Sequence, residues 1–430
     1  MAYVLGIDIG NTSTVAAVAH HRDGRWAQPE PVALHPGPGP LPSALLLATD
    51  GTFTLGESEE SERTARGVLS RVGDNVPLLL AGERYRPETL VALLAAHVVD
   101  QVHGARGGPA EMVVLSHPAS WGRYRRDLLH SALWDYGLKE VTLLPRTVTV
   151  AEGYAARGFA GEVAAVYALG GDTFEAALVR RNSRDRYETV GVPRTLARLG
   201  GADFDAALAA HVRTVLVREL TAAGPGARTA LCRLPAECER AKRDLTVESQ
   251  TDVALSLPIG PVRVPVTRLE FEELIRPAVQ TTVALLAQAV RGANLAPAQL
   301  DGVLLAGGAS RVPLVAELIA TAGFPVETAP DPQHTAAAGA AAAGTRILSP
   351  RPLPAGPPSP AGPPTTAEFP AAVATTSHGP MARTAGPPLG PTDDLTHGDE
   401  PPPRPPVRYP PLDLPKRARR KLVRSRGHEG

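Results

Sequence analysis

Residues 3–19 read YVLGIDIGNTSTVAAVA, and residues 164–180 read AAVYALGGDTFEAALVR. Each stretch holds two apolar runs of strand length that are joined by a short turn rich in glycine and hydroxyl side chains, GNTS at 10–13 and GGDT at 170–173. Apolar runs flanking such a turn are typical of a strand, a tight turn and a second strand. Because one chain repeats this unit, the sequence predicts two related halves that face one cleft.

The rest of residues 1–346 alternates strand-like and helix-like segments, which is the pattern of an α/β protein. Residues 231–245 and 271–293 carry apolar side chains at helical spacing, so we expect a helix in each. The composition then changes, because 21 of the 44 prolines fall in the last 81 residues. Proline excludes helix and sheet interiors, so 347–430 is predicted to be a disordered or polyproline II tail. Its basic end, 416–426, could touch an anionic surface, although such runs are more often solvated.

The overall charge and the cysteine content exclude several classes of protein. The chain has 430 residues, of which 44 are basic and 44 acidic, so the formal net charge is zero and no overall field attracts nucleic acid or anionic lipid. Cys232 and Cys238 are too few for a disulfide framework, and we interpret them as helix-borne thiols in a reducing compartment. We find no secretion signal and no apolar run near the roughly 18 residues of a membrane helix. A cytoplasmic location without a transmembrane segment is therefore predicted.

A third glycine turn, GGASR at 307–311, follows the apolar run 303–306. Glycine after a buried strand lets backbone amides approach an anion, and successive N–H groups form an anion-binding nest. One such turn alone is more often an ordinary hairpin, but three along one chain favour phosphate binding. Asp8 lies two residues before the first turn on an otherwise apolar strand, where burial is costly unless a cation or a donor meets it. We expect it to contact Mg²⁺ through water.

The order of these motifs resembles that of the DnaK-type chaperones, the seventy-kilodalton heat-shock family. The resemblance covers about four fifths of the chain and is carried by the two phosphate loops (6–12 and 169–175), an LGGEDFD-like segment (199–205), an adenosine-clasping helix (237–245) and an adenosine motif (305–313). It implies an actin-like ATPase fold, in which two duplicated ribonuclease-H-like halves surround a nucleotide cleft. It also implies ATP or ADP with Mg²⁺, and a nucleotide-binding domain at 1–346. Sugar kinases share the broad fold, but the helix and the LGGxDFD segment favour the chaperone branch.

The resemblance also assigns site residues, because several positions match the motifs of the family. The phosphates would lie at Gly10, Asn11, Thr12, Ser13, Gly170, Gly171 and Thr173. The adenosine would lie at Glu239, Lys242, Arg243, Thr246, Gly307, Gly308, Ser310 and Arg311. Asp8 would meet the metal through water, with Asp172 as a second candidate. The chemistry fits, since a guanidinium stacks on a purine and Lys or Glu can bond ribose hydroxyls. Without the resemblance, helix 237–245 is an ordinary ion-paired surface helix.

The polar residues expected around the γ-phosphate depart from the family pattern. Leu69 stands at the position of the catalytic lysine, and no lysine occurs before Lys139. Pro145 falls where the family has a glutamate, and Ala168 replaces the aspartate that opens the second loop. The residues retained are Asp8, Thr173 and Glu175. Because single donors in comparable sites are worth roughly 10² to 10³ in rate, the sequence predicts nucleotide binding with slow or absent hydrolysis.

Three hypotheses for the function follow from these residues. The leading one is a chaperone-related or regulatory ATP-binding module, whose nucleotide state or tail recruits other proteins. A DnaK-type chaperone continues into a peptide-binding β-sandwich, whereas 347–350 here lead into the proline-rich tail, so we do not expect ATP-driven clamping of peptide. One alternative is an active ATPase that has repositioned its polar groups, for example Asp172 and Arg71. The other is a nucleotide-free scaffold whose proline-rich segments meet SH3-like partners.

Overall fold

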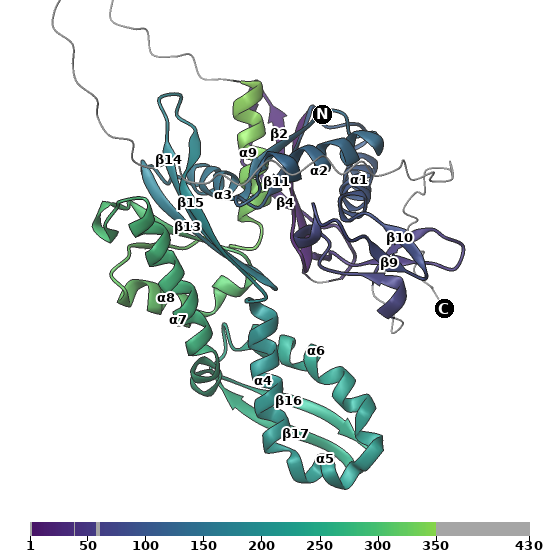
Figure 1. Cartoon of the computed structure of the whole chain (residues 1–430). Helices are drawn as coiled ribbons and strands as arrows, with labels where there is room; N and C mark the ends of the chain where they lie inside the picture. Colours follow the sequence, from purple (N-terminus) through teal and green to yellow (C-terminus); the bar gives the residue numbers. More distant parts are fainter. Residues whose placement is uncertain (1, 38, 57–60, 350–430) are drawn as a thin grey trace, which may run out of the picture. The chain divides into compact units, whose positions relative to one another are not determined.

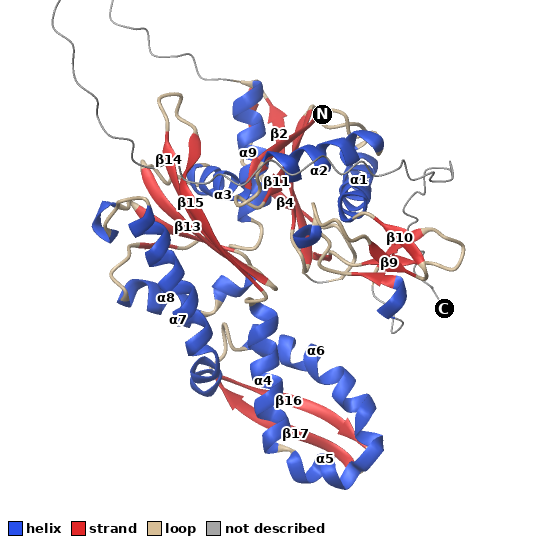
Figure 2. Cartoon of the chain, viewed as in Figure 1, coloured by secondary structure: helices blue, strands red, loops and turns tan. Residues whose placement is uncertain are grey.

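The computed structural model describes residues 2–37, 39–56 and 61–349, and the predicted tail lies outside the described residues from 350 onward. Two sheets of similar topology carry the fold (Figures 1 and 2). In the first sheet β1 is parallel to β11 and antiparallel to β2, and β12 extends it beyond β11. Its strands are β1 (Tyr3–Ile9), β2 (Ser13–Arg22), β11 (Met112–His117) and β12 (Val141–Pro145), with the short strands β3 (Arg25–Trp26), β4 (Glu30–Val32) and β5 (Leu41–Pro42) beside β2.

The second sheet repeats this arrangement. Its central strand β13 is antiparallel to β14 and parallel to β18, which pairs in turn with β19. The strands are β13 (Val163–Leu169), β14 (Thr173–Arg181), β15 (Tyr187–Ala197), β18 (Gly302–Ala306) and β19 (Val326–Glu327). The sheet order β15-β14-β13-β18-β19 corresponds to β3-β2-β1-β11-β12. The predicted α/β class and the duplication are both confirmed.

The two predicted turns also have the same local geometry. The amide of Gly10 donates to the carbonyl oxygen of Ser13 at 2.9 Å, and the amide of Gly170 donates to that of Thr173, also at 2.9 Å. Each turn joins the central strand of its sheet to the antiparallel neighbour. The two turns are therefore equivalent parts of the duplicated unit.

Helices cover these sheets and bury their apolar faces. Leu5 and Ile7 of β1 join one core with α1, whereas Tyr167 and Phe174 of the second sheet join another core with α7. Helix α7 begins where it does because its N-cap Thr267 and Glu270 form a reciprocal capping box. The covering helices are α1 (Pro87–Arg106), α2 (Arg123–Asp135), α3 (Arg146–Ala155), α7 (Arg268–Gly292), α8 (Pro313–Thr321) and α9 (Thr335–Leu348).

The residues between β15 and α7 form a group of helices with a hairpin, seen at the bottom of Figure 1. This group contains α4 (Gly201–Val215), α5 (Val217–Ala223), η3 (Gly224–Ala227), α6 (Arg228–Asp244), β16 (Gln250–Leu257) and β17 (Gly260–Thr267). The helices predicted at 231–245 and 271–293 are confirmed as α6 and α7, each beginning three residues earlier. Cys232 and Cys238 are both free thiols on α6, as predicted.

Short elements fill the chain between β5 and α1, and others connect the larger ones. Two small sheets pair β6 with β7 and β8, and β9 with β10. These elements are β6 (Leu45–Leu47), β7 (Phe53–Leu55), η1 (Ser61–Arg63), β8 (Thr64–Ala65), η2 (Leu69–Arg71), β9 (Leu78–Leu80) and β10 (Glu83–Tyr85), followed later by η4 (Pro297–Gln299) and η5 (Gly308–Arg311). Of these, η2 and η5 border the candidate site.

Helix α9 ties the structure together through backbone contacts. A Cβ added to Gly339 of α9 would lie 1.6 Å from the carbonyl oxygen of Thr149 in α3. A Cβ on Gly6 of β1 would lie 2.2 Å from the carbonyl oxygen of Ala337 in α9. The alanine-rich sequence 336–343 is therefore a buried helix that needs small residues on both sides. Helix α9 ends two residues beyond the predicted domain boundary at 346, which remains a prediction.

Candidate functional site

The first two glycine turns lie against each other. A Cβ on Gly171 would lie 2.5 Å from Oγ1 of Thr12. Nδ2 of Asn11 donates to Oδ2 of Asp172 at 3.4 Å, and Oδ1 of Asn11 accepts the amide of Ser70 at 2.9 Å. The structure thus brings together the two turns predicted to hold phosphate, although they are far apart in the sequence.

The third turn packs on the second one. Gly307 has a φ of 86°, in the left-handed region that favours glycine, and a Cβ there would lie 2.3 Å from the carbonyl oxygen of Leu169. A Cβ on Gly200 would lie 2.7 Å from the carbonyl oxygen of Gly170. Only glycine fits at these contacts, so the walls between the turns are made of backbone. The amides of Gly10, Gly170 and Gly307 donate to backbone carbonyl oxygens, so an anionic ligand such as phosphate would be met by the other amides of these turns.

Gly201 at the start of α4 connects helix α6 to the third turn. A Cβ on Gly201 would lie 3.0 Å from Nζ of Lys242 and 3.4 Å from Cβ of Ala309. Nζ of Lys242 donates to the carbonyl oxygen of Gly201 at 2.9 Å and to Oδ2 of Asp205 at 2.6 Å. Burial raises the pKa of Asp205, and Lys242 opposes that shift. The Lys242 ammonium is therefore held against α4, where it compensates a buried carboxylate.

The other predicted side chains on α6 are exposed. Glu239 and Arg243 pair at 2.5 Å, with 48% and 60% of their side chains exposed. Arg243 also lies near the first half of the molecule, since a Cβ on Gly39 would be 4.0 Å from its Nη1. Thr246 differs, because its hydroxyl donates to the carbonyl oxygen of Arg243 at 2.7 Å and so completes the end of α6. Glu239 and Arg243 are the members of this group best placed to meet a ligand.

The third turn continues into the single helical turn η5. The hydroxyl of Ser310 donates to the carbonyl oxygen of Gly307 at 2.7 Å, so this side chain stabilises the turn. Gly308 faces Gln333, whose side chain would lie 3.6 Å from a Cβ there. Gln333 was not predicted as a site residue from the sequence. Arg311 is exposed at the end of η5.

A largely buried ion pair, with 13% and 15% of its side chains exposed, lies beside the first turn. Nε of Arg146 donates to Oδ1 of Asp8 at 2.9 Å, and Nη2 of Arg146 donates to the carbonyl oxygen of Ile9 at 3.0 Å. The hydroxyl of Ser116 donates to the same oxygen of Asp8. Although burial lowers the pKa of Arg146, the carboxylates of Asp8 and Glu175 raise it above its usual value. The sequence did not predict this guanidinium, which begins helix α3 directly after Pro145.

Glu175 completes the charged group around Arg146. It is 5% exposed, and its Oε2 accepts the amide of Ala119 at 2.9 Å. Burial raises the pKa of this carboxyl, and the positive charge of Arg146 works against that shift. Ala168 pairs directly with Glu175 across β13 and β14. It occupies the place in the second half that Asp8 occupies in the first, so one half has a carboxylate there and the other a methyl group.

The remaining positions that depart from the family pattern carry no charge toward the turns. Leu69 is 3% exposed and packs in the core that includes Leu5, so the backbone of Ser70 approaches the first turn instead. Pro145 ends β12. Arg71 bonds within its own loop, to the carbonyl oxygen of Val76 at 3.1 Å and to Asp74 at 3.5 Å.

His117, one residue after Ser116, makes stability depend on pH. Burial lowers its pKa to about 4, a shift that the Pro118 carbonyl opposes and that Arg126 and Arg146 strengthen. An unfolded histidine takes up its proton near pH 6.5. The neutral, buried His117 therefore makes its full contribution to the free energy of unfolding above that pH, and the contribution falls by about 3 kcal/mol as the pH decreases to 4. We expect His117→Phe, which keeps an aromatic ring beside Trp121, to lose less stability over this range in urea titrations at several pH values. Equal losses in both proteins would contradict this assignment.

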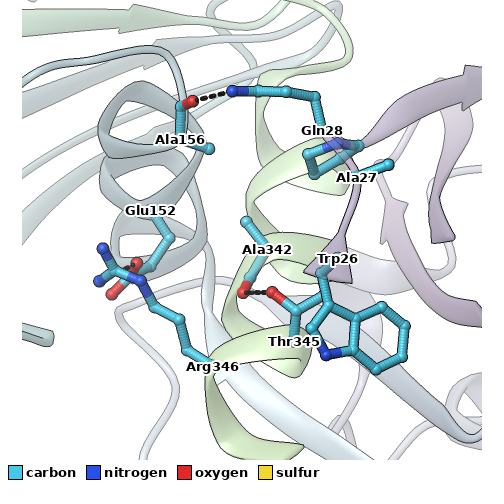
Figure 3. Close-up of a pocket in the computed structure, with 9 residues that line it drawn as sticks. Trp26, Ala27, Gln28, Glu152, Ala156, Ala342, Thr345 and Arg346 are labelled. Atoms are coloured by element: carbon cyan, nitrogen blue, oxygen red, sulfur yellow. Dashed lines mark hydrogen bonds and ion pairs between the residues drawn. The ribbon is translucent and has the colours of Figure 1, made fainter. Parts of the chain in front are cut away.

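A small cavity of about 180 Å³ lies away from the glycine turns, between α3, α9 and residues 26–29. Figure 3 shows Glu152 and Arg346 pointing toward each other at its edge, where they form an ion pair of 2.9 Å. Glu152 is 3% exposed, and burial raises its pKa while Arg346 opposes the shift. None of the predicted site residues lines this cavity.

We expect Arg346→Met to destabilise the protein by about 2 kcal/mol at neutral pH, because it leaves the Glu152 carboxylate buried without its partner. Partial exposure of Arg346 keeps this cost below that of a fully buried pair. Adding Glu152→Gln to this variant is expected to restore most of the loss, because the buried charge is then gone. Urea denaturation of the two single variants and the double variant measures the coupling, and strictly additive effects would contradict the pairing.

None of the helices in the described part of the chain has the length and apolar character needed to span a membrane.

Comparison with known proteins agrees with this architecture. The chain is similar to the chaperone protein DnaK of Thermotoga petrophila, of Thermotoga sp. (strain RQ2) and of Thermotoga maritima, at 27% identity over 341 residues in each case. These matches cover 74% of this chain and 54% of each relative, so the chain spans about half the length of the curated relatives it matches. The family profile of the Hsp70 protein matches residues 66–353, and the chain belongs to the Hsp70 family, with a nucleotide-binding domain of the actin-like ATPase fold.

Proposed function

We propose that this Hsp70-family domain binds ATP or ADP and hydrolyses ATP slowly or not at all, so that it acts as a nucleotide-dependent binding module. The observation that carries the proposal is a contrast within one site. A Cβ would meet backbone atoms at Gly200 and Gly307 and the Thr12 side chain at Gly171, so the glycine turns pack closely together, as a phosphate site requires. Leu69 is buried at the position expected for the catalytic lysine, Lys242 is held by Asp205, and the Asp8 carboxylate is already paired with Arg146.

Binding and hydrolysis depend on different parts of the site. Binding needs the backbone amides of the turns and the exposed Glu239 and Arg243 of α6. Phosphoryl transfer depends mainly on charge neutralisation and on an aligned water, so it is sensitive to the polar groups around the terminal phosphate. Leu69 is buried in the core and Ala168 is apolar, so those groups are missing while the binding framework remains.

Calorimetric titration of the full chain with ATP and with ADP tests the proposal. We expect a dissociation constant of about 1–10 μM for each nucleotide. Arg243→Glu is expected to weaken both by about tenfold, since it reverses a charge that is 60% exposed beside the proposed adenosine position. Arg233→Glu is the matched control, because Arg233 is an exposed arginine on the same helix. Absence of binding by the wild-type chain would leave the scaffold hypothesis in place of this one.

The cellular role is the less direct part of the proposal. Hsp70-family domains generally bind nucleotide together with Mg²⁺, and a change of bound nucleotide can alter which proteins such a domain contacts. Recruitment of protein partners, a cytoplasmic location and a contribution of the proline-rich tail remain predictions from the sequence.

A further inference from the structure

We propose that Arg146 takes the place of a divalent cation at Asp8, so that this site binds nucleotide without Mg²⁺. The inference rests on the proposed nucleotide binding and concerns the charge that accompanies the phosphates. The carboxylate expected to hold the hydrated metal is the one that Arg146 occupies, so the residues present do not fit the metal site implied by the family.

The guanidinium of Arg146 is fixed by two bonds to adjacent residues. Its Nε lies 2.9 Å from Oδ1 of Asp8, and its Nη2 lies 3.0 Å from the carbonyl oxygen of Ile9. Ile9 immediately precedes Gly10, the first residue of the first glycine turn. The side chains of Arg146 and Asp8 are only 13% and 15% exposed, so solvent screens this pair weakly. The guanidinium of Arg146 is therefore held next to the first residue of the turn.

The same contacts oppose a magnesium ion. A metal bound through water needs a carboxylate oxygen that can accept from those waters, but Oδ1 of Asp8 already accepts from Arg146 and from Ser116, which leaves only Oδ2 for them. A guanidinium and a divalent cation on one carboxylate also repel each other strongly where solvent is largely excluded. Asp172 accepts from Asn11. Across residues 2–37, 39–56 and 61–349, no three His, Cys, Asp or Glu side chains are grouped so that they could hold a metal ion.

Arginine can perform the electrostatic part of the role of the metal. It stays protonated at all physiological pH values, and its planar group matches the geometry of phosphate oxygens. The bonds to Asp8 and Ile9 engage two of its five N–H donors. The negative charges of Asp8 and Glu175 raise its pKa further, although burial opposes them. Arg146 thus offsets the charge of Asp8 and keeps its remaining N–H donors for phosphate oxygens.

Titration of the full chain with ADP, once with excess Mg²⁺ and once with EDTA, tests the inference. We expect the two dissociation constants to agree within about threefold. In Arg146→Gln we expect the affinity without metal to fall about tenfold or more, and Mg²⁺ to recover part of it because Asp8 is released. Arg146→Lys keeps the charge and is expected to remain insensitive to Mg²⁺. Arg123→Gln is the control, because it removes a guanidinium that is 89% exposed on α2.

A second measurement follows the metal itself. Since linkage is reciprocal, a protein whose ADP affinity ignores the metal leaves the metal affinity of ADP unchanged. Titration of Mn²⁺ into ADP, followed by electron paramagnetic resonance, is expected to give the same affinity with and without the protein, within about threefold. ADP binding by the wild-type chain that requires Mg²⁺, or Mn²⁺ held more tightly in its presence, would overturn this inference alone. No ADP binding under either condition would overturn the proposed function and this inference together.

Discussion

Replacing Gly339 with alanine is expected to cost about 3 kcal/mol or more of folding stability, although the change adds a single methyl group. A Cβ at this position would lie 1.6 Å from the carbonyl oxygen of Thr149 and 2.6 Å from the amide nitrogen of Gly153, and backbone atoms cannot move aside as a side chain can. Helices α3 and α9 would have to separate. Because α9 also touches β1 through Gly6, the displacement would reach the strand that leads to the first turn.

Chemical denaturation followed by circular dichroism measures this loss. Gly108→Ala is the matched control, because nothing lies within 4 Å of a Cβ there and its backbone is not in the left-handed region. We expect the control to stay within about 0.5 kcal/mol of the wild-type chain. A Gly339→Ala protein as stable as that control would mean that α3 and α9 do not pack this closely in solution.

The duplicated fold could be predicted because its signal is local. Each strand, turn and strand lies within 17 consecutive residues, 3–19 and 164–180, and the turn residues show where the chain reverses. Helical spacing likewise located α6 and α7 to within three residues at their starts, since apolar periodicity persists over many turns. Short strands such as β9 and β10 were not predicted, because three residues carry too little pattern.

The charges of the site could not be predicted in the same way. Arg146 and Asp8 are 138 positions apart, and no local pattern indicates that they form a pair. Lys242 was expected to face a ligand, but the structure turns its ammonium toward Asp205. Sequence motifs fix the backbone course of a site more firmly than the partners of its charged side chains, because those partners come from distant segments. The glycine turns were therefore located correctly, whereas the pairing at Asp8 required the structure.

The two halves of the duplicated fold differ in charge at equivalent positions. Asp8 and Ala168 hold equivalent places in the two halves, two residues before Gly10 and Gly170. One strand therefore brings a carboxylate toward the turns, and the other brings only a methyl group. The alanine at position 168 supplies no carboxylate, and Arg146 neutralises the carboxylate of Asp8. Both features reduce the negative charge at the place where a metal and an attacking water would be held.

The full chain is expected to release phosphate from ATP at least about 10³-fold more slowly than the DnaK protein of Thermotoga maritima assayed beside it, because at least two polar groups worth roughly 10² or more each are absent. Leu69 is buried in the core, so no side chain can act from the position of the lysine. Single-turnover assays with radiolabelled ATP measure the rate, and the calorimetric titration on the same sample confirms that the nucleotide is bound. Slow release by a chain that does not bind ATP would say nothing about the chemistry.

Arg146→Gln separates the effect of the guanidinium on hydrolysis from the effect of the missing groups. Removing the guanidinium frees Asp8, but Leu69 and Ala168 remain apolar, so we expect the release rate to rise less than about tenfold. Because the same substitution is expected to alter the Mg²⁺ dependence of ADP binding, a change in binding without a change in rate would locate the catalytic defect at the positions of Leu69 and Ala168. A rate close to that of DnaK in the wild-type chain would instead show that other side chains, such as Asp172, have taken over the chemistry, and the domain would then be an active ATPase. Such a rate in the variant alone would show that the guanidinium itself prevents hydrolysis.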